Sequence, residues 1–368
     1  MNQQQIKLGI REYVSIAILM VGAKATEDTP TILYKIVQNA SWMIPVLAAG
    51  ISVIPLLLLL KTLSLYPDKD LFSVIRKLFG KYIGFLICLL IFLISSCGIS
   101  FDSRSYSNII RTFYYPTTPT LVIYALLLAI CAYGAKKGIQ HIGSVAYLIV
   151  FYAVISLYIA FLLSTKTSTI RAIFPILGSG PAEIVKGSFI GLSLFTDFFL
   201  FTTIIPFISS GKDFRKGTWI SFLFITFSLC VMILAYICMF DTSLGTIGYP
   251  FHTLIRYISL GSYLPNVEII FFVIWLMSAF IRFTAFLYIN GMMFGFLFKI
   301  NDFEYLIPSL ATLYLLIGSF PESAGVASQF KMFTSSAAGI VYASMSVLLW
   351  LAALLRGEFK HAKNRNSM

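Results

Sequence analysis

Long apolar segments recur along almost the whole chain, and this repetition limits the possible folds more than any other feature of the sequence. Each run is about 20 residues long, the length that an α-helix needs to cross the hydrocarbon core of a bilayer. Of the 368 residues, 58% are hydrophobic and only 11% are charged, too few charges for the surface of a soluble domain. The sequence therefore predicts an all-α integral membrane protein.

The polar breaks predict ten transmembrane helices in a single polytopic domain over residues 1–368, with 357–368 as a cytoplasmic tail. Two helices are interrupted, the first over 9–37 and the sixth over 184–210. The other eight are expected at 41–61, 81–106, 119–135, 142–164, 217–240, 265–290, 303–319 and 336–356. The N-terminal residues lack the features of a cleavable secretory signal, so we expect the first span to stay in the membrane.

Lysine and arginine residues are unevenly distributed across this expected topology. Most precede the first helix, follow an even-numbered helix or lie in the tail. The opposite side keeps only Lys24, Lys35, Arg104, Arg111, Lys166, Arg171, Lys186, Arg256 and Lys331. The positive-inside rule then places both termini in the cytoplasm and accounts for most of the net charge of +12. No compact basic patch with interleaved aromatic residues suggests nucleic acid as a partner.

The first helix is interrupted by a polar segment that begins at Gly22 and continues through Ala23, Lys24, Ala25 and Thr26 to Pro30. Non-helical backbone at membrane depth is tolerated only where it is buried in protein or lines a cavity. One interpretation is an unwound segment at a binding site, whose free N–H groups face a ligand carboxylate. The alternative is a short helix followed by an ordinary outer loop, and these residues alone favour neither.

The sixth helix contains Phe195, Thr196 and Asp197 in mid-span. An ionisable side chain inside a membrane is costly unless it is solvated or paired, so Asp197 is a candidate functional residue. The alternative is an aspartate that only holds two helices together beside a water-filled crevice. Gly187 and Gly191 in the same helix are spaced for helix packing rather than for ligand contact.

Interruptions in helices one and six of ten predict two five-helix halves of opposite topology, about 9–164 and 184–356. This inverted repeat is the plan of many secondary transporters, whose binding sites lie near the bilayer midplane. Arg282, well inside helix eight, either takes the place of a coupled sodium ion or extends to the headgroups. Asp102 and Arg104 are expected to form a polar cluster at the membrane interface.

No signature of an enzyme or of a cofactor site is found. The sequence contains no Walker loop, nucleophile elbow or HExxH motif, so we expect neither catalysis nor a cofactor. The three histidines, His141, His252 and His361, are expected in loops or the tail, and no His-based metal site is predicted.

Several short motifs, in order along the chain, resemble the B subunit of bacterial spore germinant receptors. This group is a branch of the amino acid–polyamine–organocation transporter superfamily. The motifs are Tyr66-Pro67, Leu71-Phe72, Gly80-Lys81-Tyr82-Ile83-Gly84, Phe174-Pro175-Ile176-Leu177-Gly178-Ser179-Gly180, Pro206, Phe214-Arg215, Val273-Ile274-Trp275 and Tyr288-Ile289-Asn290-Gly291.

The resemblance implies a leucine-transporter-like fold with a ligand site between helices one, three, six and eight. It also implies a receptor in the inner membrane of the spore, working with an A subunit and a lipoprotein C subunit. The chain departs from the family at both breaks. It has Lys24 where many members have a Gly-x-Gly-like sequence, and it has Phe195-Thr196-Asp197 where many have a Gly-aromatic-Glu step.

The leading hypothesis is therefore a receptor subunit that binds a small germinant, an amino acid or a similar nutrient, in a midplane pocket. The residues expected to bind it are Gly22, Ala23, Lys24, Ala25, Thr26, Phe195, Thr196 and Asp197. In this scheme Phe195 covers the ligand and Asp197 holds its amino or hydroxyl groups. The rival is a proton-coupled amino acid permease in which Asp197 or Glu27 titrates, and a ligand-opened ion channel overlaps with the receptor.

Overall fold

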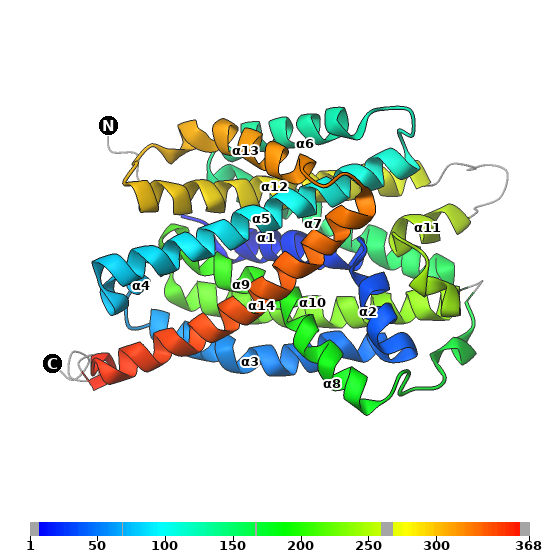
Figure 1. Ribbon diagram of the computed structural model, residues 1–368, viewed down its shortest axis with the longest axis horizontal. Helices are drawn as coiled ribbons and strands as arrows, with labels where there is room; N and C mark the ends of the chain where they lie inside the picture. Colours follow the sequence, from blue (N-terminus) through cyan, green and yellow to red (C-terminus); the bar gives the residue numbers. More distant parts are fainter. Residues whose placement is uncertain (1–6, 68, 166–167, 259–267, 361–368) are drawn as a thin grey trace.

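Helices make up nearly all of the described chain, and most of them run along the long axis of the molecule (Figure 1). The computed structural model describes residues 7–67, 69–165, 168–258 and 268–360. Of the features expected from sequence, Lys166, His361, residues 265–267 at the start of the expected eighth helix and residues 361–368 of the tail lie outside the described residues.

In the described residues, each of the ten expected segments is helical, and the first and sixth are interrupted as predicted. The first consists of α1 (Ile10–Gly22), the 3-10 turn η1 (Ala23–Ala25) and α2 (Thr29–Val37). The sixth consists of α8 (Pro181–Ile190), η4 (Gly191–Phe195), α9 (Asp197–Leu200) and η5 (Phe201–Phe207). The continuous helices are α3 (Ile44–Leu63), α5 (Lys81–Phe113), α6 (Thr120–Ala135), α7 (Ile139–Ser164), α10 (Gly211–Phe240), α12 (Glu268–Phe298), α13 (Ile307–Ser319) and α14 (Ala324–Leu355).

The outer surface is that of a protein surrounded by lipid. Among the described residues, seven helical segments are both long and apolar enough to cross a membrane, and two shorter apolar helices accompany them. Large apolar side chains are exposed on the outside, for example Leu148 and Phe151 of α7, which are 65% and 63% exposed. Because water would not tolerate so apolar an exterior, the chain is a multi-pass membrane protein.

The helix boundaries differ from the sequence prediction in one place that matters for the site. The last helix begins at Ala324 rather than near residue 336, because the Ser323 hydroxyl caps it by accepting a hydrogen bond from Val326 N (3.3 Å). Hydropathy missed this first part because it contains several polar residues. As a result Lys331, which was assigned to an outer loop, lies inside the bundle and is only 7% exposed.

Two short helices outside the predicted spans close the ends of the bundle. α4 (Leu71–Phe79) is capped by Asp70, whose carboxylate accepts a hydrogen bond from Ser73 N (3.3 Å). α11 (Pro250–Tyr257) lies at the opposite end from α4 (Figure 1). The four remaining 3-10 turns are η2 (Gln38–Met43), η3 (Ile170–Ile173), η6 (Asp241–Gly245) and η7 (Phe303–Leu306).

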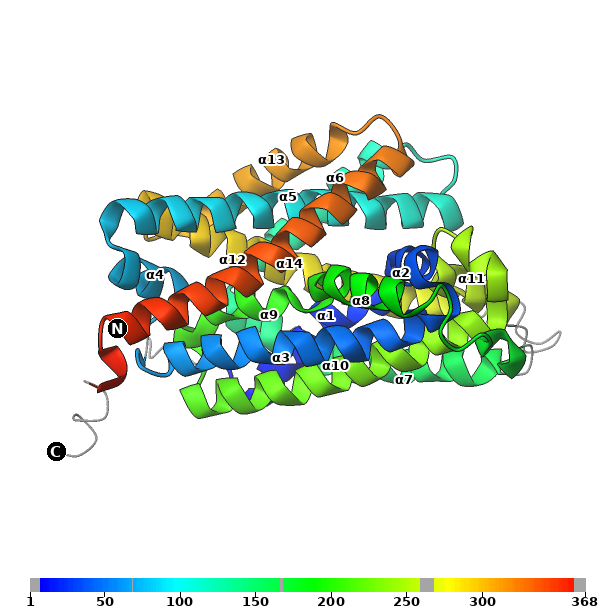
Figure 2. The same cartoon turned by 60° about the horizontal axis from the view of Figure 1, so that its bottom comes forward.

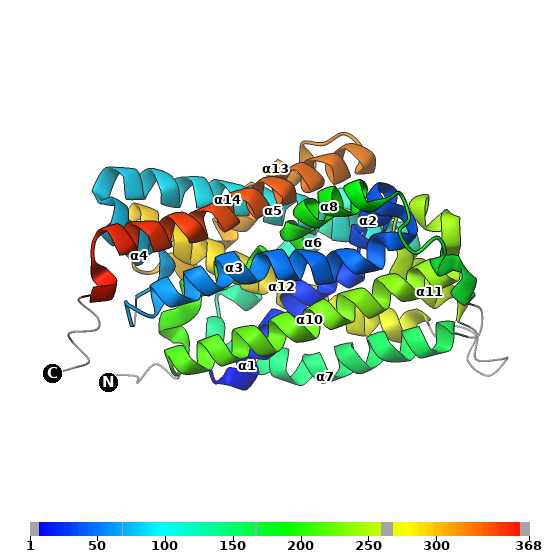
Figure 3. The ribbon, with the colours of Figure 1, turned by 90° about the horizontal axis from the view of Figure 1, so that it is seen from below.

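The interruptions of both segments are buried inside the bundle. α1 packs against α7, α10 and α12, whereas α14 crosses the molecule diagonally over α5 and α3 (Figure 2). The start of α1 and the end of α14 lie at the same end of the bundle (Figure 3), as an even number of spans requires.

Two glycines allow the sixth segment to lie close to its neighbours, as their spacing predicted. A Cβ atom on Gly187 would lie 2.8 Å from Val37 Cγ1, and one on Gly191 would lie 2.7 Å from Ile44 Cγ2. Both distances are shorter than van der Waals contact, so any larger residue would push the sixth segment away from α2 and α3. These glycines therefore serve packing.

Candidate functional site

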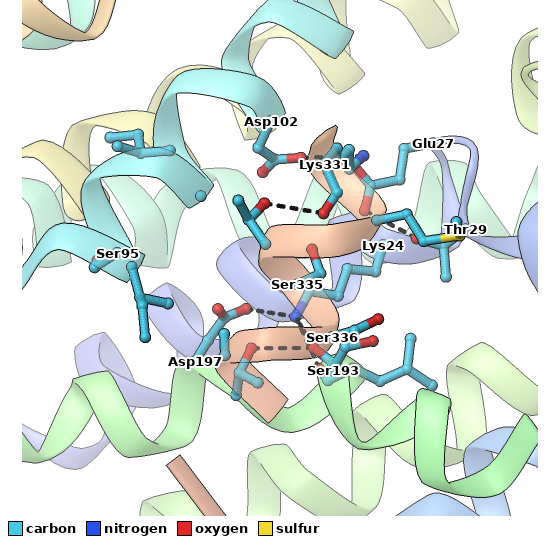
Figure 4. Close-up of a pocket in the computed structure, with 18 of the residues that line it drawn as sticks. Lys24, Glu27, Thr29, Ser95, Asp102, Ser193, Asp197, Lys331, Ser335 and Ser336 are labelled. Atoms are coloured by element: carbon cyan, nitrogen blue, oxygen red, sulfur yellow. Dashed lines mark hydrogen bonds and ion pairs between the residues drawn. The ribbon is translucent and has the colours of Figure 1, made fainter. Parts of the chain in front are cut away.

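The two interrupted segments are joined by the side chain of Lys24. Its Nζ donates hydrogen bonds to Ser193 O (3.0 Å) and Leu194 O (2.9 Å) and lies 2.9 Å from Asp197 Oδ2. η4 is a 3-10 helix, in which hydrogen-bond geometry is poorer than in an α-helix, so its carbonyls can accept further bonds from side chains; Ser193 O also accepts one from Thr196 Oγ1 (3.0 Å). The ammonium group from one break therefore pairs with the carbonyls and the carboxylate of the other (Figure 4).

The break in the first helix is buried in protein, which contradicts the alternative of an ordinary outer loop. Lys24, Ala25, Thr26 and Glu27 are each no more than 8% exposed. The backbone carbonyl of Ala25 accepts a hydrogen bond from the Tyr236 hydroxyl (2.9 Å). The packed surroundings thus satisfy polar backbone that lipid could not.

Thr26 connects the same break to helix eight. Its hydroxyl donates to Ala23 O (2.8 Å) and accepts a hydrogen bond from Trp275 Nε1 (3.1 Å). Trp275 in turn stacks on Tyr106 with ring centroids 5.0 Å apart. The turn at Ala23–Thr26 is therefore fixed by groups from α12 and α5.

Arg282 is buried in the bundle and does not extend to the headgroups. Its side chain is 3% exposed, and its Nε and Nη2 donate to Asp102 Oδ2 at 2.9 and 2.6 Å. Nη1 donates to the carbonyl of Met20 at the end of α1. Arg282 thus joins α12, α5 and the first helix, and Asp102 belongs to this core site rather than to an interfacial cluster.

Lys331 forms a second charged centre that sequence reasoning missed. Its Nζ donates to Glu27 Oε2 (2.6 Å) and Asp28 Oδ1 (2.7 Å), and it lies 3.2 Å from Asp102 Oδ1. The lysine thereby connects α14 to the first break and to α5. The sequence did contain a signal for this centre: two adjacent acids in the break of the first helix and one in helix three. Buried carboxylates require cationic partners, so these acids indicate that a cation lies near them.

A cavity of about 100 Å³ opens between these charged groups. Its charged lining is Lys24, Glu27, Asp102, Asp197, Arg282 and Lys331, and its hydroxyl-bearing lining includes Ser95, Ser193, Thr196, Ser335 and Ser336. Apolar walls come from residues such as Ile99, Leu200 and Phe286. The space is ample for several water molecules or a small polar ligand.

Only some of the predicted ligand-binding residues face this cavity. Lys24, Thr196 and Asp197 do, as does Arg282, which was predicted to replace a cation or to extend to the headgroups. Gly22, Ala23 and Thr26 instead line a separate, mainly apolar cavity of about 70 Å³ between α1, α7, α10 and α12. Ala25 is buried in the core. Phe195 packs on Phe222 (4.7 Å between centroids), so it does not cover the charged cavity in this structure.

His252 lies in α11, where the sequence predicted a loop, and it is fully buried. Its Nδ1 lies 3.1 Å from the Tyr114 hydroxyl, and its ring meets Trp275 edge to face at 4.5 Å. Burial, with a smaller effect of the nearby Arg256 cation, lowers the pKa of His252 to about 3. The imidazole is therefore neutral, and it supports the tryptophan that binds Thr26.

Two interrupted helices that meet at a polar cavity within a membrane bundle define a secondary-transporter type of protein. Solved structures agree on this fold. MhsT in complex with L-phenylalanine matches with a TM-score of 0.63 and 13% identity over 90% of this chain and 87% of that chain. A mutant of the manganese transporter of Eremococcus coleocola matches with a TM-score of 0.58 and 12% identity over 96% of this chain and 78% of that chain. The fold is thus leucine-transporter-like, with two five-helix halves of opposite topology.

The chain belongs to the family described as spore germination protein, whose family model matches residues 11–325. Relatives from Bacillus subtilis (strain 168) include spore germination protein YndE, 24% identical over 83% of both chains. Spore germination protein KB from the same organism is 20% identical over 80% of both chains. The resemblance to germinant-receptor B subunits is confirmed, and the protein is a transporter-like subunit of the germination machinery.

Proposed function

We propose that this subunit binds a small nutrient germinant, an amino acid or a similar molecule, in the charged cavity and so triggers germination. The observation that carries the proposal is the meeting of both helix breaks at one cavity, where Lys24 already pairs with Asp197. A ligand amino group at Asp197 would compete with Lys24 and loosen the connection between the two breaks. Thr196 and the serine hydroxyls would hold the ligand's other polar groups.

Binding would act by favouring one arrangement of the bundle over another. A ligand shifts such an equilibrium only by its difference in affinity for the two states. Because Lys24 holds three oxygen atoms of the sixth segment, the state with this pair intact and the state with it opened differ in how the two breaks are joined. We propose that the partner subunits respond to the state in which this pair is opened.

Those partners would be an A subunit and a lipoprotein C subunit in the inner membrane of the spore, with both termini of this chain in the cytoplasm. Arg282 would take the place of a coupled cation, because it already joins the end of α1 to α12 through Met20 O. With Arg282 in this role, the response to the ligand would not require sodium.

The proposal is tested with spores that lack this gene and all other germinant receptors except its own partner subunits. The gene is returned as wild type, as Asp197→Ala and as Thr26→Val, and germination is scored against a panel of amino acids and sugars. We expect wild type to restore the response to one nutrient class and Asp197→Ala to abolish it. A normal response in both variants would contradict the proposal.

A proton-coupled amino acid permease is the second candidate, favoured by the buried carboxylates Glu27 and Asp197 at the cavity. Either could carry a proton during transport. The two functions differ in what the chain does alone. A permease expressed without partners accumulates labelled substrate in vesicles and acidifies the receiving side, whereas a receptor subunit does neither.

A further inference from the structure

The charged groups around the cavity do not balance. Three cations, Lys24, Arg282 and Lys331, face four carboxylates, Glu27, Asp28, Asp102 and Asp197. None of these seven side chains is more than 11% exposed. In their ionised forms they carry one excess negative charge, and an uncompensated charge in a bundle core is strongly unfavourable.

The three cations are already occupied by protein acceptors. Lys24 contacts Ser193 O, Leu194 O and Asp197 Oδ2. Lys331 contacts one oxygen each of Glu27, Asp28 and Asp102. Arg282 donates hydrogen bonds to Asp102 and to the carbonyl of Met20. A ligand carboxylate would therefore have to displace an internal carboxylate to reach a cation.

The carboxylates, by contrast, leave one acceptor unused at the cavity wall. Among the described residues, Asp197 Oδ2 lies 2.9 Å from Lys24 Nζ, and no side chain or backbone N–H donates a hydrogen bond to Asp197 Oδ1. The Asp197 side chain is 6% exposed and lines the cavity beside Thr196 (Figure 4). An unpartnered oxygen of a buried, ionised carboxylate favours a donor that carries positive charge.

We propose that the cavity selects for one positive charge: its ligand binds as a cation, with the charged group at Asp197 Oδ1, and needs no carboxylate. The charge could come from the ammonium group of a small organic amine or from an inorganic monovalent cation. This inference rests on the proposed ligand site and narrows its chemistry, because a zwitterion leaves the excess charge in place while an amine cancels it.

Asp28 offers a test that changes the charge balance without changing the cavity wall. It contacts Lys331 (2.7 Å) and Ser328 (3.3 Å) but does not line the cavity. Asp28→Asn removes the excess negative charge and leaves Lys331 with Glu27 and Asp102. Asp302→Asn, the same chemical change at an exposed loop residue, is the matched control.

The experiment measures binding to the purified full-length chain in lipid nanodiscs, by calorimetry and by the ligand-induced rise in melting temperature. The probes are glycinamide, glycine and glycolate, which have similar size and carry positive, zero and negative net charge at neutral pH. Sodium chloride and potassium chloride are added as competitors, against choline chloride at equal ionic strength. The comparison of the three probes uses only the wild-type chain, so it does not depend on whether any variant folds.

We expect glycinamide to bind more tightly than glycine, and glycolate not to bind. Asp28→Asn is expected to weaken glycinamide binding about tenfold, the scale of one charge–charge interaction shielded from water, while Asp302→Asn leaves it unchanged. Competition by sodium or potassium, but not choline, would identify an inorganic cation as the natural source of the charge. If neither ion competes, the natural source of the charge is an organic amine.

Three results overturn the inference: glycine or glycolate binding at least as tightly as glycinamide, equal glycinamide affinity in a folded Asp28→Asn variant, or no binding of any probe cation. If glycine binds without any preference for glycinamide and Asp197→Asn abolishes that binding, the ligand site stands and only its charge selectivity is refuted. If spores also germinate normally with both Asp197→Ala and Thr26→Val, the proposed function fails as well.

Discussion

Lys24 Nζ and Asp197 Oδ2 lie 2.9 Å apart, so one ion pair joins the break in the first helix to the break in the sixth. Both side chains are nearly buried, with 11% and 6% exposure. Breaking a buried pair by removing one partner leaves an uncompensated charge, which is usually more harmful than removing both. The pair therefore holds the two breaks together and makes their separation sensitive to whatever competes for Asp197.

Lys24→Met should destabilise the protein by about 3 kcal/mol, because it leaves Asp197 buried without a cation. The double variant Lys24→Met/Asp197→Asn should recover part of that loss, since no charge is left unpaired. Thermal unfolding of the detergent-purified variants measures this double-mutant cycle. Lys186→Met, which removes the exposed pair with Glu183, is the control and should change stability by less than about 1 kcal/mol. Strict additivity of the two core substitutions would contradict the coupling.

Hydropathy predicted the ten-helix bundle, because long apolar runs in lipid satisfy their backbone groups by forming helices, whereas the leucine-transporter-like fold was also implied by the family resemblance. It also found both breaks, since Lys24 and Asp197 interrupt apolar sequence. It could not predict which charges meet. Asp102 was assigned to an interface because its partner Arg282 lies 180 residues away in the sequence, and Lys331 was assigned to a loop because its neighbours are polar. Pairing of distant charges depends on how the helices pack, and hydropathy carries no information about that packing.

Arg282 should make the ligand response independent of sodium, because its guanidinium already fills the junction between Met20 O and Asp102. Spores carrying the wild-type gene should germinate equally in sodium-free and sodium-containing medium, whereas Arg282→Ala should lose the response in both. Arg282→Lys is the matched control for charge, and it should restore the response only partly, since a single ammonium group cannot reach Asp102 Oδ2 and Met20 O together as the guanidinium does. Sodium dependence of the wild type would contradict this role.

Lys331 should be as important for stability as the residues that the sequence pointed to. Lys331→Met leaves Glu27, Asp28 and Asp102 clustered without their shared lysine, and we expect a loss of about 3–5 kcal/mol, from both lost attraction and carboxylate repulsion. Melting temperature in detergent measures the loss. Lys77→Met is the control, because its pair with Glu358 is partly exposed (42% and 23%) and should contribute less than about 1 kcal/mol. Equal effects of the two substitutions would mean that the Lys331 cluster is solvated.

His252 should make the protein less stable in mild acid. Burial lowers its pKa in the folded protein to about 3 from the usual 6.5, so folding favours the neutral imidazole. Its contribution is complete above pH 6.5 and is lost as the pH falls toward 3, by up to about 1.4 kcal/mol per pH unit. The melting temperature should therefore decrease from neutral pH to about pH 5, and His252→Gln should flatten that decrease. His141, exposed near the start of α7, provides the control, since His141→Gln should keep the wild-type slope. If His252→Gln kept that slope as well, the acid sensitivity would have to come from the carboxylates of the cavity instead of from the imidazole beneath Trp275.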